Sequence, residues 1–268
     1  MKKLLKIYNV LIYVFLYAPI AVIVLFSFNG GTSRAHMNGL SLQWYAELFE
    51  DELILRSLYY SLIIAVLSAI IATLIGTMAA LGINALKGWK KSLFLSVNNI
   101  PVVNPEIVTA ISMMILFVFI LSFFNGMEMG FSTLLIAHIT FNIPYVVLSV
   151  LPKLRGMDHN IYNAALDLGC PPLKAFFKVV IPQIMPGIVS GLIMAFTLSL
   201  DDFVISYFNS GASFQTLPIT IYSMTKKPYS LKLNALSTLL FAVVLALMLV
   251  VNLKNPQKKQ RRRKEGRI

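Results

Sequence analysis

Cysteine, histidine and the motifs of nucleotide chemistry are scarce or absent in this chain of 268 residues. Its one cysteine, Cys170, excludes an internal disulfide. The three histidines, His36, His138 and His159, fall in different segments, so their spacing predicts no metal site. The sequence has no phosphate-binding loop of the pattern G-x-x-x-x-G-K-[ST] and no spacing typical of a catalytic triad. We therefore predict a protein that is not an enzyme and that binds no metal or cofactor.

Apolar residues, in contrast, are abundant. They make up 57% of the chain, which is high for a soluble domain and typical of a membrane protein. A spanning helix needs about 20 apolar residues, because hydrocarbon offers backbone groups no partners. Stretches of this kind occupy residues 8–28, 58–83, 93–124 (interrupted), 131–151, 184–208 and 233–253. The sequence thus predicts an all-α, polytopic integral membrane protein with six transmembrane helices and no separate soluble domain.

Positive charge is unevenly divided between the predicted loops. If the N-terminus lies inside, 18 of the 23 Lys and Arg residues fall on inner segments and five on outer ones. Cytoplasmic loops carry such an excess, so both termini are predicted to be cytoplasmic. The basic tail, residues 254–268, follows a membrane helix and lacks interleaved aromatic residues. Contact with anionic membrane lipid is therefore favoured over binding to nucleic acid.

The N-terminal part, residues 1–57, combines the first span with an outer loop. Lysines precede this span, as in a signal peptide, but its apolar run is too long and residues 28–31 lack a small-x-small cleavage site. We expect a retained helix. Residues 41–49 predict a short amphipathic helix with Ser41 as its N-cap, and Trp44 is expected to anchor it at the headgroup level. Residues 58–253 would form a core of five transmembrane helices.

The third span is interrupted by Pro101, Pro105 and Glu106. Proline removes a backbone donor and unsettles the helical turn before it. Two interpretations remain open. The irregular backbone could lie at membrane depth, buried in protein or facing water. Alternatively, residues 101–105 could lie in the inner interface, and the true span would then begin at Glu106.

Residues 158–186 form a patterned polar segment between two apolar spans on the basic side of the membrane. Asp158 is a plausible N-cap, and Gly169 stands where a left-handed C-terminal cap belongs. Between them runs one stripe of apolar side chains, and beyond them three prolines mark the start of a second helix and the return to the membrane: Ile161, Ala164, Ala165, Leu168, then Pro171, Pro172, Pro182. The segment could lie on lipid, but its small residues and turn favour a protein partner.

This segment carries a specific resemblance. Asn163-Ala164-Ala165, three residues, Gly169, nine residues and Val179-x-Ile181-Pro182 resemble the coupling-loop signature of binding-protein-dependent ABC importer permeases. The resemblance implies the MetI-like permease fold in a bacterial inner membrane, with residues 153–183 as a cytoplasmic coupling loop in which Ile161–Leu168 would dock on an ATPase. It also implies two ATPase subunits that hydrolyse ATP, a homologous second permease and an extracytoplasmic binding protein. The coupling residues would be Asn163, Ala164, Ala165, Asp167, Gly169 and Pro182. The family usually has Glu where Asn163 stands, and Asp167 could take part of that role.

A second resemblance concerns the cargo. Residues 196–208 and 105–108 are similar to the corresponding segments of spermidine/putrescine permeases, most of all to the second permease subunit. The resemblance implies a polyamine cargo, delivered by a polyamine-binding protein. Acids within spans are costly and usually face a cavity, and aromatic faces attract ammonium groups. The predicted substrate path is formed by Glu106, Asp201, Asp202, Phe203 and Tyr207.

Alternatives remain for the acids and for the function. Asp201 and Asp202 point in different directions on a helix, so one could line the path while the other pairs with a cation or a helix end. Both could instead cap the fifth span and hold the 209–232 loop. The cargo could be ferric iron, thiamine or another solute. An ion-driven carrier is the alternative from another class, although neither inverted repeats nor coupling-ion residues are evident.

Overall fold

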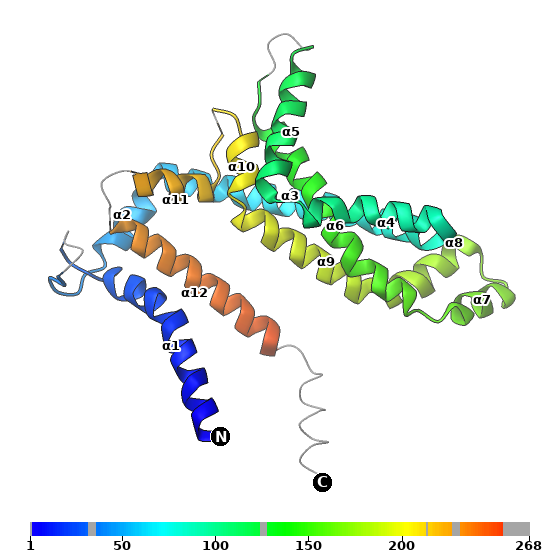
Figure 1. Ribbon diagram of the computed structural model, residues 1–268, viewed down its shortest axis with the longest axis horizontal. Coiled ribbons are helices and arrows are strands. Elements are labelled where there is room, and N and C mark those ends of the chain that lie inside the picture. The colour runs from blue at the N-terminus through cyan, green and yellow to red at the C-terminus, as the bar shows by residue number, and fades with distance from the viewer. Residues whose placement is uncertain (1, 32–35, 124–127, 213, 227–230, 254–268) are drawn as a thin grey trace. The chain divides into compact units, whose positions relative to one another are not determined.

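The computed structural model is helical. It describes all residues except 1, 32–35, 124–127, 213, 227–230 and 254–268, so the basic tail lies outside the described residues. Within the described part the sole β-type pairing is an isolated bridge between Asn29 and Leu40. The elements, shown in Figure 1, are α1 (Lys2–Phe26), α2 (Gln43–Glu50), α3 (Glu52–Ala85), α4 (Gly88–Val103), α5 (Glu106–Leu121), α6 (Phe131–Arg155), α7 (His159–Asp167), α8 (Pro172–Ala175), a π-helical turn (Phe176–Val180), α9 (Ile181–Asp201), α10 (Val204–Asn209), α11 (Leu217–Lys226) and α12 (Lys232–Leu253). The prediction of an all-α membrane protein is confirmed.

Most of the predicted spans coincide with helices long and apolar enough to cross a membrane. Four such stretches are Tyr8–Phe26, Glu52–Ala85, Phe131–Arg155 and Pro172–Asp201, and the bent pair α4 and α5 would make a fifth. The predicted sixth span coincides with α12, whose described apolar part is Lys232–Val243. The count of six spans therefore stays a prediction.

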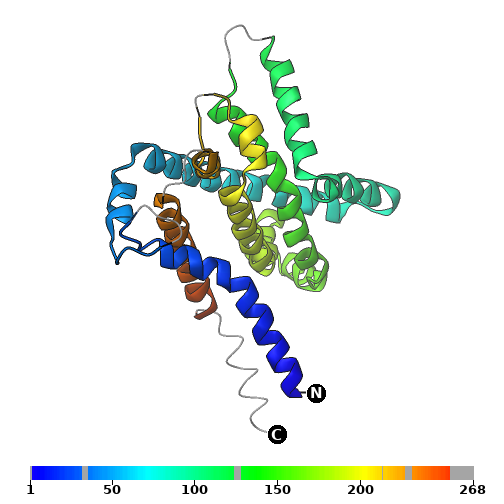
Figure 2. The same ribbon diagram turned by 60° about the vertical axis from the view of Figure 1, so that its left-hand side comes forward.

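The interruption of the third span is a sharp bend. Helices α4 and α5 meet at 103°, and Figure 2 shows α5 leaving the end of α4 steeply. Asn104 is extended, with φ −71° and ψ 140°, as expected of a residue before proline. The helix that follows begins at Glu106, in agreement with the second interpretation. Pro101, however, lies inside α4, so residues 101–103 are helical.

The chain divides into two compact units, Met1–Leu55 with Ile221–Ile268 and Arg56–Thr220. In the first unit, α12 packs against α1 and α2. Lys232 ties α12 to the end of α2, because its Nζ lies 3.0 Å from Oδ2 of Asp51 and 3.9 Å from Oε2 of Glu47. Burial alone would raise the pKa of Asp51, but the hydrogen bonds and the charge of Lys232 hold it below its ordinary value.

One prediction about α2, its N-cap, is wrong, and the headgroup-level position of Trp44 stays a prediction. The N-cap of α2 is Leu42, and the Oγ of Ser41 instead accepts a hydrogen bond from the backbone N–H of Gln43 at 3.1 Å. Trp44 is 8% exposed, and its Nε1 donates to the carbonyl oxygen of Asn29 at 2.7 Å. The indole therefore fastens α2 to the loop after α1, which is a packing role. A buried indole N–H needs such an acceptor.

In the second unit, α6 packs against α9 along much of its length, and α3 approaches α6 closely. Glycine allows this contact. An added Cβ at Gly76 of α3 would lie 2.8 Å from Cβ of Val146, and one at Gly187 of α9 would lie 3.0 Å from the carbonyl oxygen of Ser149. Small residues permit close helix packing where lipid supplies no hydrophobic driving force.

This packing gives a first prediction. We expect Gly76→Ala to destabilise the protein by about 1–3 kcal/mol, because the new methyl group cannot fit without moving the backbone of α6. Gly82→Ala is the matched control, since among the described residues an added Cβ there meets open space on the same helix. Thermal unfolding of the purified protein in detergent measures the difference. Equal unfolding temperatures for the two variants would refute the tight contact.

The fifth span differs from its prediction at both ends. A single helical run extends from Pro172 to Asp201, so no break precedes Pro182. Pro182 has no backbone N–H to donate, and the π-turn before it accommodates this, with Ile181 donating to the carbonyl oxygen of Phe176. The run ends at Asp201 rather than at 208, and residues 204–209 form the separate helix α10.

Candidate functional site

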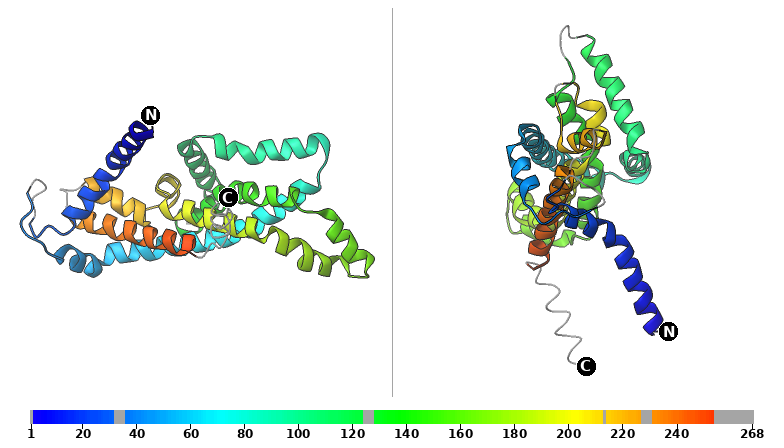
Figure 3. Two further views of the ribbon diagram at one scale, coloured as in Figure 1. Left: turned by 90° about the horizontal axis from the view of Figure 1, so that it is seen from below. Right: turned by 90° about the vertical axis from the view of Figure 1, so that its left-hand side faces the viewer.

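Helix α7 is a short, well-capped helix between α6 and α8, as Figure 3 shows. Asp158 is its N-cap, as predicted, and its Oδ1 accepts the N–H of Asn160 at 2.9 Å. At the other end Gly169 has φ +79°, the predicted left-handed conformation. Cys170 donates to the carbonyl oxygen of Ala165 at 3.0 Å, and Gly169 donates to that of Leu166 at 2.9 Å. These two bonds constitute a Schellman motif.

The residues predicted to couple to an ATPase lie on the solvent side of this segment. The side chains of Asn163, Ala164 and Asp167 are exposed, and that of Ala165 is half-buried. Two large apolar side chains accompany them, Ile161 at 49% and Leu168 at 89% exposure. Tyr162 of the same helix packs against the buried core of the second unit. Helix α7 thus presents an apolar, small-residue face that this chain leaves uncovered among its described residues. Pro182 is also exposed, but it lies in the first turn of α9.

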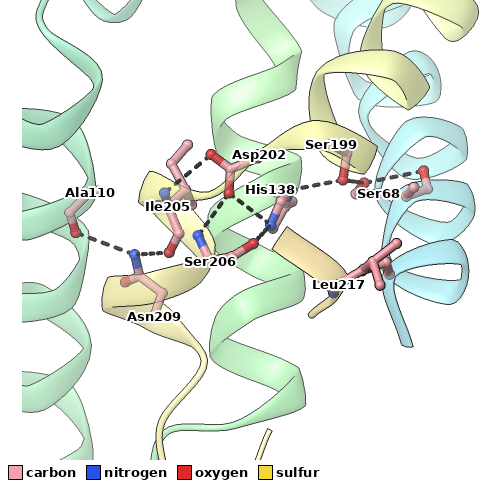
Figure 4. A network of polar contacts seen from close by, with 11 residues as sticks. Ser68, Ala110, His138, Ser199, Asp202, Ile205, Ser206, Asn209 and Leu217 are labelled. Carbon is pink, nitrogen blue, oxygen red and sulfur yellow. Dashed lines mark hydrogen bonds and ion pairs between the residues drawn. The ribbon is translucent and has the colours of Figure 1, made fainter. Parts of the chain in front are cut away.

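The two adjacent aspartates at the end of α9 have different surroundings. Asp201 is exposed, whereas Asp202 is 6% exposed. The Oδ1 of Asp202 accepts the N–H of Ile205 at 3.1 Å, and its Oδ2 accepts that of Ser206 at 2.7 Å. Figure 4 shows this carboxylate turned toward the start of α10. Asp202 therefore binds a helix end, which leaves Asp201 as the acid open to solvent.

Other residues of the predicted substrate path lie near this point. Glu106, in the first turn of α5, is exposed and close enough to feel the charges of Asp201 and Asp202. The ring of Phe203, just before α10, and that of Tyr207, within it, have centroids 5.4 Å apart, and Tyr207 is 48% exposed. Carboxylates with aromatic faces nearby are suited to an organic cation.

A buried polar network behind Asp202 is the main feature that the sequence did not reveal. His138 of α6 is fully buried, and its Nδ1 lies 2.8 Å from Oγ of Ser199. Its Nε2 lies 3.1 Å from Oγ of Ser206 and 3.6 Å from Oδ2 of Asp202. Ser68 of α3 donates to Ser199 at 2.9 Å. The hydrogen-bond partners of His138 lie 61 and 68 positions away in the sequence, so no local spacing pointed to them.

The described residues contain no cluster of three or more His, Cys, Asp or Glu side chains that could hold a metal ion.

Comparison with known protein families shows to which family the chain belongs. Residues 72–255, well over half of its length, match the family described as "Binding-protein-dependent transport system inner membrane component". The chain belongs to this family. It is thus a multi-pass membrane protein, and its fold is that of an ABC importer permease.

Curated relatives and solved structures agree with this assignment. The chain is 37% identical over 240 residues to the spermidine/putrescine transport system permease protein PotC of Escherichia coli K12, covering 90% of this chain and 88% of PotC. It is 38% identical to the putrescine transport system permease protein PotI of the same strain, covering 87% and 83%. A bacterial ABC transporter that imports the polysaccharide alginate shares the fold, with a TM-score of 0.67, 15% identity and coverage of 94% and 96%.

Proposed function

We propose that this chain is a transmembrane permease subunit of an ATP-driven ABC importer for polyamines. One observation carries the transport part of the proposal. Helix α7 holds Asn163, Ala164 and Ala165 of the coupling signature, and two apolar side chains at its ends, Ile161 and Leu168, are uncovered. A face of this kind suits a groove on a soluble partner. The partner would be the ATPase subunit, on which ATP hydrolysis would reside.

The cargo assignment has separate support. The relatives that cover about nine-tenths of this chain carry spermidine and putrescine in their names. In this chain the exposed carboxylates of Glu106 and Asp201 lie within range of each other's charge, which suits a substrate with several ammonium groups. Asp202 is buried and takes a structural part instead. Asp201, Glu106, Phe203 and Tyr207 would form the path.

The assembly and its orientation follow from the same proposal. The chain would pair with a homologous permease, two ATPase subunits and an extracytoplasmic polyamine-binding protein. Both termini would face the cytoplasm, in keeping with the distribution of Lys and Arg. Closure of the ATPase dimer would move α7 and rock the spans between inward and outward openings.

Reconstitution tests this function. Proteoliposomes holding this chain with its second permease, ATPase and binding protein should accumulate radiolabelled spermidine or putrescine when they enclose ATP. Liposomes without the ATPase, or with a non-hydrolysable nucleotide, should not. Accumulation driven by an ion gradient without the ATPase would favour a secondary carrier. Uptake of ferric iron or thiamine in place of polyamines would leave the importer assignment intact and refute the cargo.

A further inference from the structure

The buried network around His138 joins four segments of the second unit. Ser68 comes from α3, His138 from α6, and Ser199 from α9, while Asp202 and Ser206 flank the start of α10. All five residues are less than 9% exposed. The contacts among them, drawn in Figure 4, lie at the point where α9 ends and the backbone of Asp202 becomes extended, with φ −64° and ψ 124°. The network therefore lies at the break beside the exposed carboxylate of Asp201.

The donor and acceptor of each hydrogen bond in this network can be assigned from its neighbours. Both oxygens of Asp202 accept backbone N–H groups, so the carboxylate ends the chain of bonds as an acceptor. Nε2 of His138 lies 3.6 Å from Oδ2 of this carboxylate, which favours a hydrogen on Nε2. The hydroxyl oxygen of Ser206, 3.1 Å from Nε2, then accepts that hydrogen. Nδ1 must consequently accept from Ser199, and Ser199 in turn accepts from Ser68. This order assigns the Nε2–H tautomer to His138.

We infer that His138 is a positioning residue for Asp201, and this inference rests on the cargo path proposed above. The side chains of adjacent residues point in different directions. If Asp202 is held in the core, its position therefore determines where the side chain of Asp201 lies. Asp202 is held by the backbone N–H groups of Ile205 and Ser206, and His138 bonds to the hydroxyl of the same Ser206 from the facing helix. With residue 202 fixed inside, residue 201 stays on the exposed side. His138 itself is buried and does not touch the cargo.

Chemical accessibility tests the positioning without any transport. Cys170→Ser removes the one native thiol, and Asp201→Cys then supplies a single reporter. A charged thiol reagent should modify position 201 in the assembled complex. Adding His138→Leu should slow that reaction about fivefold, the size expected when a buried hydrogen bond is lost, because residue 202 is then free to turn outward and residue 201 inward.

Two further variants complete this test. His138→Gln should restore the rate to within about twofold, because its amide can accept from Ser199 and donate to Ser206 as the imidazole does. Thr197→Val is the matched control on α9, since the hydroxyl of Thr197 is exposed and bonds within its own helix to the carbonyl oxygen of Ile193. An unchanged rate in the His138→Leu variant, in complexes of normal yield, would overturn the inference.

A transport measurement separates positioning from general stability. In the Asp201→Asn background, adding His138→Leu should lower the maximal uptake rate by at most a further factor of about two. The carboxylate through which His138 acts is already absent in that background. If His138 only stabilised the fold, His138→Leu would lower the uptake rate by the same factor in the Asp201→Asn background as in the parent. That result would refute the positioning role. The thiol reaction needs no cargo. A complex that transports no polyamine would therefore refute the proposed function. The thiol accessibility of position 201 would still show whether His138 positions that residue.

Discussion

Replacing Gly169 by valine should lower ATP-driven uptake about tenfold or more while the protein still inserts into the membrane. Gly169 has φ +79°, and a side chain costs about 1–2 kcal/mol in this left-handed conformation, more when it is β-branched. Among the described residues an added Cβ there meets open space, so the cost comes from the backbone alone. The variant would release the Schellman bonds to Ala165 and Leu166 and change the direction in which α7 leaves its cap.

Two matched variants make this prediction specific. Gly169→Asn should keep most of the uptake, because asparagine tolerates the left-handed conformation better than other residues. Gly82→Val places the same side chain in open space on α3, where the backbone is helical, and should leave uptake near that of the parent. Uptake of labelled spermidine and the amount of inserted protein are measured together. Normal uptake by the Gly169→Val variant would count against a role of this segment in coupling.

Neutralising Asp201 should lower polyamine uptake about tenfold, because a hydrogen bond between charged groups contributes about 1.5–3 kcal/mol. Asp201 is exposed at the end of α9, and Glu106 lies within range of its charge. Glu106→Gln should also lower uptake. The effects of Asp201→Asn and Glu106→Gln should not be additive, because two ammonium groups of one cargo molecule would bridge both carboxylates.

The controls separate cargo contact from folding. Glu50→Gln removes an exposed carboxylate from α2 and should leave uptake unchanged. Asp202→Asn should instead reduce the yield of folded complex, because it replaces a buried acceptor that holds two backbone N–H groups of α10. Initial rates of spermidine uptake, normalised to complex yield, measure these effects. An Asp201→Asn variant with the uptake of the parent would exclude Asp201 from the path.

The features that the sequence predicted well are those determined by local rules. The length of apolar stretches located the helices, and Asp158 and Gly169 located both ends of α7 because capping depends on a few neighbouring residues. The same rules could not tell that the helix before Pro182 would continue into the membrane. A π-turn accommodates the missing donor, and its residues Phe176 and Val180 pack in the core of the second unit, which no local rule describes.

The acidic site was predicted in part. The sequence placed both aspartates within the fifth predicted span and indicated that they could have different roles, but it could not tell which was buried. That distinction depends on His138 and Ser68, which are brought to Ser199 and Asp202 by tertiary packing of helices distant in sequence. The hydrogen bond of Trp44 was unpredictable for the same reason. Its acceptor, the carbonyl oxygen of Asn29, lies in a loop that no sequence spacing relates to Trp44.

The central claim is that the energy of ATP enters this chain through α7, and site-directed cross-linking tests it most directly. In a Cys170→Ser background, Asn163→Cys labelled with a thiol-reactive benzophenone should form a light-dependent adduct with the ATPase subunit. Leu42→Cys, exposed in the first unit before α2, should form none and should react with a membrane-impermeant reagent added outside intact cells. An Asn163→Cys variant that gives no ATPase adduct, or that reacts with the impermeant reagent from outside, would contradict the account.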